Sequence, residues 1–131
     1  MKILVIEDDP LVRESMERML TRAGHEVCWA ATGTRGLAMM REEKPDLVFL
    51  DLILGDDMNG WELARDKRDD PEIAAIPAIV LTGLEPRAAR IRGEFHESML
   101  SEILLIMSKP PAQGAILKAV EHIGALKKLC A

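Results

Sequence analysis

The sequence predicts an α/β domain built on a parallel sheet. Short apolar runs alternate along the chain with longer segments in which apolar residues recur at helical spacing, as in consecutive βα units. A chain of 131 residues is long enough for one domain with a substantial core, and a hydrophobic content of 48% argues against disorder. We therefore expect one domain over residues 1–131, with five strands and five helices.

The first strand and helix illustrate the pattern. An apolar run predicts a strand at 2–6, after which Asp9 can cap a helix and Pro10 suits its first turn. Gly24 is a typical helix stop. The inward face of this helix is predicted to be a stripe with a period of 3.6 residues, formed by Leu11, Val12, Ser15, Met16, Met19 and Leu20.

The remaining elements follow the same alternation, separated by glycine, proline and aspartate at the expected turns. A loop rich in Gly, Asp and Asn follows the third strand. The last helix should turn Ile116, Val120 and Ile123 inward. The expected strands are 26–30, 46–50, 78–82 and 103–107, and the expected helices are 33–43, 60–69, one opened by Pro86, and 112–128.

Polar residues stand where the predicted strands end. Glu7 and Asp8 follow the first strand, Asp51 the third, Thr82 the fourth and Lys109 the fifth. The carboxyl ends of parallel strands meet at one edge of an open sheet, so these side chains should converge there. Three carboxylates suit a hard cation such as Mg²⁺, and a hydroxyl and an ammonium suit phosphoryl oxygens. The pattern predicts phosphoryl transfer, with Asp51 as the acceptor.

Composition excludes several other classes of function. The net charge is −5 and the pI about 5.2, without the basic excess of a nucleic-acid-binding domain. No apolar stretch is long enough to cross a membrane, and the N-terminus is not a secretory signal. We expect a cytoplasmic protein that binds neither nucleic acid nor membrane. Cys28 and Cys130 are expected to be free thiols, although two cysteines leave a disulfide as the alternative.

Five short motifs occur in the same order as in a known family. With them the chain resembles, over essentially its whole length, the receiver domain of two-component response regulators. The resemblance implies a flavodoxin-like, doubly wound sheet of five parallel strands in the order 2-1-3-4-5, with helices on both faces. The motifs are Lys2-Ile-Leu-Val-Ile-Glu-Asp-Asp9, Asp51-Leu-Ile-Leu, Met58-Asn-Gly60, Leu81-Thr-Gly83 and Lys109-Pro110.

The resemblance also implies a role for each site residue. Asp51 would take a phosphoryl group from a sensor histidine kinase or a histidine phosphotransfer protein, and the change would alter a surface that an unknown effector reads. Such a domain is not an enzyme, since it catalyses only its own phosphorylation and dephosphorylation. The implied Mg²⁺ ligands are Asp8, Asp51, Glu7 and the Ile53 backbone carbonyl, and the implied contacts to phosphoryl oxygens are Thr82 and Lys109.

The chain departs from the family pattern at three points, and other interpretations stay open. The segment from Thr82 to Lys109 is several residues longer than is typical. The loop after Asp51 is one residue longer than usual and has Gly55 where the family has proline. Ile106 stands where many receivers carry Tyr or Phe. A phosphatase of the haloacid-dehalogenase type is the rival enzyme, but it needs a second acid two residues after the nucleophile, where this chain has Ile53. The chain could also be the receiver part of a longer regulator or hybrid kinase.

Overall fold

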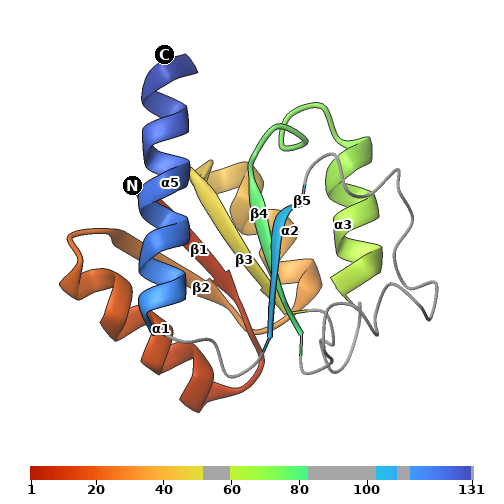
Figure 1. Ribbon diagram of the computed structural model, residues 1–131. Helices are drawn as coiled ribbons and strands as arrows, with labels where there is room; N and C mark the ends of the chain where they lie inside the picture. The colour runs from red at the N-terminus through yellow and green to blue at the C-terminus, as the bar shows by residue number, and fades with distance from the viewer. Residues whose placement is uncertain (52–59, 83–102, 109–112, 131) are drawn as a thin grey trace.

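Five parallel strands form one sheet in the order β2-β1-β3-β4-β5 (Figure 1), which confirms the predicted topology. The computed structural model describes residues 1–51, 60–82, 103–108 and 113–130. The expected helix opened by Pro86 lies outside these residues. The strands are β1 (Lys2–Ile6), β2 (Glu26–Ala30), β3 (Leu47–Asp51), β4 (Ala78–Thr82) and β5 (Ile103–Ser108).

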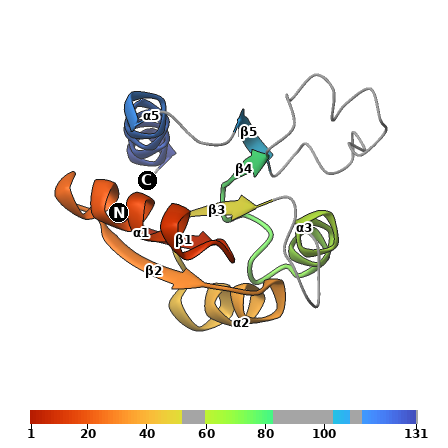
Figure 2. The same cartoon turned by 90° about the horizontal axis from the view of Figure 1, so that it is seen from below.

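Helices cover both faces of the sheet (Figure 2). Helices α1 and α5 lie on one face, and α2 and α3 on the other. The interior is accordingly divided into two apolar clusters, one that contains Met16 of α1 and Ile116 of α5, and one that contains Leu37 of α2 and Leu63 of α3. The helices are α1 (Pro10–Arg22), α2 (Gly33–Glu43), α3 (Gly60–Asp69) and α5 (Gln113–Cys130).

The termini of α1 form as the sequence predicts. The Asp9 side chain accepts a hydrogen bond from the backbone N–H of Leu11, and Pro10 occupies the first turn. Just after the helix, Gly24 has a φ of +93°. A residue with a side chain would be strained in this backbone conformation, so glycine is favoured here.

The predicted inward stripe of α1 was wrong at two positions. Leu11 is 76% exposed and Ser15 is also exposed, whereas Met16 and Leu20 are buried. Val12 and Met19 pack partly against the same core. Leu11 and Ser15 are four residues apart and so share a stripe of their own, which is rotated by about 100° from the neighbouring stripe of Val12 and Met16. Only one of these two stripes faces the sheet.

The third strand is displaced by one residue from its expected position. Asp46 precedes β3, and its carboxylate accepts a hydrogen bond from the Lys2 backbone N–H at 2.8 Å. Asp51 is therefore part of the strand itself and lies against β4, where it pairs with Leu81. Most of its surface is buried as a result, with 4% exposed.

The last helix and Cys28 agree with expectation. Ile116, Val120 and Ile123 of α5 are buried in the core cluster. Cys28 is a free thiol that packs against the other core cluster, and burial raises its pKa. In the part of the chain that the structure describes, no helix is both long and apolar enough to cross a membrane.

Candidate functional site

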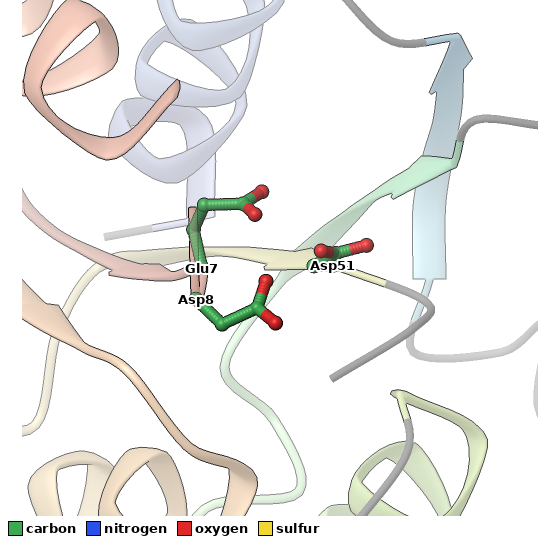
Figure 3. Close-up of side chains that lie close together, drawn as sticks. All are labelled: Glu7, Asp8 and Asp51. Atoms are coloured by element: carbon green, nitrogen blue, oxygen red, sulfur yellow. The ribbon is translucent and has the colours of Figure 1, made fainter. Parts of the chain in front are cut away.

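Strand register brings three acidic residues together at the carboxyl edge of the sheet. Ile6 of β1 pairs with Leu50 of β3, so the chain positions that follow, Glu7 and Asp51, lie side by side. Asp8 extends from the same strand end toward Asp51 (Figure 3). The sequence prediction that these carboxylates converge is confirmed.

The three carboxylates form a compact cluster. One oxygen from each lies within 4.8 Å of the other two. Glu7 is fully buried and Asp51 nearly so, whereas Asp8 is exposed. Negative charges held this close repel one another, and a cation that binds between them offsets the repulsion. Two or three carboxylate oxygens are also the donors that Mg²⁺ prefers, so the residues fit this ion.

The backbone between β1 and α1 is held from both sides. The Glu7 N–H donates to the carbonyl of Ala30 at 3.0 Å, which ties this segment to the end of β2. The Asp9 N–H donates to the Glu7 carboxylate at 3.2 Å, and Asp9 in turn caps α1. Asp9 is therefore a structural residue beside the cluster. These bonds fix the direction in which Glu7 and Asp8 leave the strand.

The other predicted site residues are only partly placed. Thr82 is the last residue of β4, and its backbone lies beside Ser108 of β5, at the same edge as the acids. Its side chain, Ile53 and Lys109 lie outside the part of the molecule that the structure describes. Ile106 is within β5, where its backbone pairs with Val80. The roles of Thr82, Lys109 and Ile53 stay predictions.

Two closely packed residues were not expected from the sequence, one of them next to the strand that carries Glu7. Gly36 of α2 lies so close to β1 that a Cβ atom there would be 2.5 Å from Cδ1 of Ile6. Lys67 of α3 is 2% exposed, and its ammonium donates to the carbonyl of Ala74 at 2.9 Å. A glycine inside a predicted helix was an available signal of close packing. Lysine in a polar helix carries no comparable signal of burial.

Comparison with known proteins identifies the family. Residues 3–121 match the family model described as response regulator receiver domain. Protein PilH of Pseudomonas aeruginosa is 33% identical over 122 residues, which cover 93% of this chain and 96% of PilH. The transcriptional regulatory protein AfsQ1 of Streptomyces coelicolor is 42% identical over 80 residues, but these are 61% of this chain and 34% of AfsQ1.

Solved structures agree with this match. A response regulator receiver domain protein (CheY-like) from Methanospirillum hungatei superposes with a TM-score of 0.80 at 26% identity, covering 97% of this chain and 96% of the other. A receiver domain protein from Clostridium thermocellum has a TM-score of 0.82 at 24% identity, with 99% and 98% covered, and supports the fold.

The chain belongs to the response regulator receiver domain family of two-component signalling. It is thus a signalling domain and not an enzyme, as the sequence analysis predicted. The rival assignment as a phosphatase is wrong, since the receiver family model matches most of the chain. In addition, the second acid that such a phosphatase needs, two residues after the nucleophile, is replaced here by Ile53.

Proposed function

We propose that this chain is a receiver domain over residues 1–131 that accepts a phosphoryl group on Asp51. The observation that carries the proposal is the cluster of Glu7, Asp8 and Asp51 at the carboxyl edge of the sheet, with oxygens within 4.8 Å of one another. Family membership implies a histidine kinase as partner, and we propose that a phosphohistidine on such a kinase, or on a phosphotransfer protein, is the donor. Receiver domains typically act in the cytoplasm, and we propose the same location here.

The chemistry requires the protein mainly to position groups and to balance charge. A carboxylate oxygen of Asp51 attacks the phosphorus, the new O–P bond forms, and the bond from phosphorus to the donor imidazole breaks. Bound Mg²⁺ would neutralise charge on the transferred oxygens. Asp8 and Asp51 would hold the ion directly, with Glu7 in the same acidic pocket and the Ile53 carbonyl as a further ligand. Thr82 and Lys109 would contact the remaining phosphoryl oxygens.

The burial of Asp51 supports its assignment as acceptor. With only 4% of its surface exposed, it is shielded from bulk water at the end of a strand whose backbone is paired on both sides. Asp8 is exposed and can exchange ligands with solvent. We propose that phosphorylation at this edge changes the surface that an effector reads, a shift between two conformations that the new charge would bias.

The proposal is tested with the wild-type protein and a small phosphodonor. After incubation with acetyl phosphate and Mg²⁺, intact-mass spectrometry should detect one added phosphoryl group. The modification should disappear on treatment with hydroxylamine, which cleaves acyl phosphates, and should not form when the metal is chelated. A protein that gains no phosphoryl group, or gains one equally well without divalent metal, would contradict the proposal.

Replacing Asp8 with asparagine should weaken Mg²⁺ binding by roughly tenfold or more, because it removes one anionic ligand and affinity follows ligand charge. Glu7→Gln should weaken binding less, since Glu7 could act through water. Isothermal titration calorimetry at fixed ionic strength measures both. Asp9→Asn is the matched control, because asparagine caps a helix as well as aspartate and Asp9 lies outside the cluster. Equal affinities for wild type and Asp8→Asn would exclude Asp8 as a ligand.

A further inference from the structure

A second surface feature lies at the open edge of the sheet, and its lining residue Ala30 accepts the backbone hydrogen bond from Glu7. Here a recess of about 370 Å³ lies between the end of β2 and α2, and we refer to it as the β2–α2 recess. Strand β2 is the last strand on this side of the sheet order, so the recess opens where the sheet ends. Its lining consists of Trp29, Ala30, Ala31, Thr32, Arg35 and Met39.

The lining combines an apolar floor with an exposed aromatic ring. Ala30 belongs to the core cluster beneath α2 and Met39 packs against that cluster, and together they form the apolar floor. Trp29 is 44% exposed, although indole rings are usually more buried than this. The guanidinium of Arg13 in α1 lies 3.8 Å from the centre of the Trp29 ring, which holds the ring in place by a cation–π contact. Preordered aromatic rings and arginines are the residues that dominate binding energy at protein interfaces.

The charged groups at the recess are cations. Arg35 lines the recess, and Arg13 lies over the tryptophan at its border. Neither arginine takes part in an ion pair with any residue that the structure describes. The chain as a whole carries a net charge of −5, so the sign of the charge at this patch is opposite to that of the whole chain. The Glu43 carboxylate, whose pKa is lowered mainly by Lys2 and also by Arg35, is already paired with Lys2. Charges beyond about 8 Å are largely screened at physiological salt, so a bound segment would sense mainly these two arginines.

We propose that the β2–α2 recess docks an acidic segment of a partner protein, with one apolar side chain on the recess floor and flanking carboxylates on Arg35 and Arg13. The volume suits one or two side chains, and the apolar floor gives no advantage to a free inorganic anion. The two guanidinium groups select negative charge, since each can hold a carboxylate by two parallel hydrogen bonds.

Arg35→Glu is the decisive variant because the fold should tolerate it. The Arg35 backbone N–H already donates to the Thr32 hydroxyl at 3.1 Å, at the start of α2. Glutamate at this third helical position completes a capping box with Thr32 and also suits the helix dipole. The variant therefore reverses the charge at the recess without an expected loss of stability, which thermal unfolding would verify.

The test uses a phage-displayed library of random heptapeptides, selected on the immobilised full chain and counter-selected on Arg35→Glu. Selected sequences should share acidic residues around one apolar residue. A fluorescently labelled synthetic peptide of the selected sequence is then titrated against each protein variant, and its fluorescence anisotropy reports the bound fraction. Arg35→Glu and Trp29→Ala should each weaken binding by at least about tenfold, as expected for central interface residues. The matched control, Arg65→Glu on α3, should change it less than about twofold.

Three results would overturn the proposal. One is a selection that yields basic sequences or no shared sequence. Another is a selected peptide that binds Arg35→Glu as tightly as wild type. The third is a recess that is occupied by a second copy of the chain. Sedimentation would then show a dimer that the peptide does not dissociate but that Arg35→Glu does.

Discussion

Asp51→Asn should abolish phosphorylation by acetyl phosphate. The rate should fall at least about a hundredfold, because removing the nucleophile of a reaction causes losses of this size or larger. An amide oxygen is a far weaker nucleophile than a carboxylate, and its loss of charge also removes one of the three anionic groups that would hold Mg²⁺. The measurement is the fraction of protein carrying a phosphoryl group over time, determined by intact mass. A variant that is modified as fast as wild type would assign the acceptor role to another residue.

The control for this experiment is the neighbouring acid Asp9. Asp9→Asn removes the same charge close to the cluster but preserves the cap of α1, because asparagine and aspartate cap helices equally well. Its phosphorylation rate should stay within about twofold of the wild-type rate, because the loss of one solvent-exposed charge has only a small effect. Similar losses in Asp9→Asn and Asp51→Asn would mean that local charge, and not the identity of the nucleophile, limits the reaction.

Gly36→Ala should lower the free energy of unfolding by about 1–3 kcal/mol, the usual cost of inserting a methyl group into a packed core. The new Cβ would lie 2.5 Å from Cδ1 of Ile6 and 3.0 Å from its Cγ1, both shorter than an ordinary van der Waals contact. Ile6 is 1% exposed, so its side chain has little room to yield. Urea unfolding followed by circular dichroism measures the change in the free energy of unfolding. If Gly36→Ala were as stable as wild type, α2 would be able to move away from β1 at no cost.

Three further variants separate the clash from helix propensity. Gly114→Ala in α5 meets no atom within 4 Å, so it should be neutral or stabilise by up to about 1 kcal/mol. Ile6→Val removes the Cδ1 atom that the new Cβ would strike. The double variant Gly36→Ala, Ile6→Val should therefore be more stable than the sum of the single changes predicts, by about 1 kcal/mol or more. Additive effects would show that Ile6 is not the residue that limits the approach of α2.

These two predictions concern the same edge of the sheet. Ile6 is the residue before Glu7, and its packing against Gly36 holds α2 close to the strand that carries the acidic pair. Moderate overpacking at Gly36 could thus change Mg²⁺ affinity as well as stability. The calorimetric titration used for Asp8→Asn reports this directly.

The sequence by itself determined the class of fold and the acids of the site. Alternation of apolar runs with helical periodicity specifies βα units, because each pattern buries its apolar side chains in only one kind of structure. Acids directly after the first and third runs must lie at the carboxyl ends of strands, and parallel strands bring those ends together. The convergence of Glu7, Asp8 and Asp51 follows from these two rules alone.

Only the tertiary structure decided which faces are buried and how closely the elements approach. Leu11 and Ser15 fit a helical stripe as well as their neighbours do, but the sheet contacts only the side of α1 that carries Met16 and Leu20. The burial of Lys67, the stacking of Arg13 on Trp29 and the contact of Gly36 with Ile6 each join residues from different elements or turns. Periodicity describes one element at a time, whereas such contacts depend on the distance and angle between elements, which are set when the whole core packs.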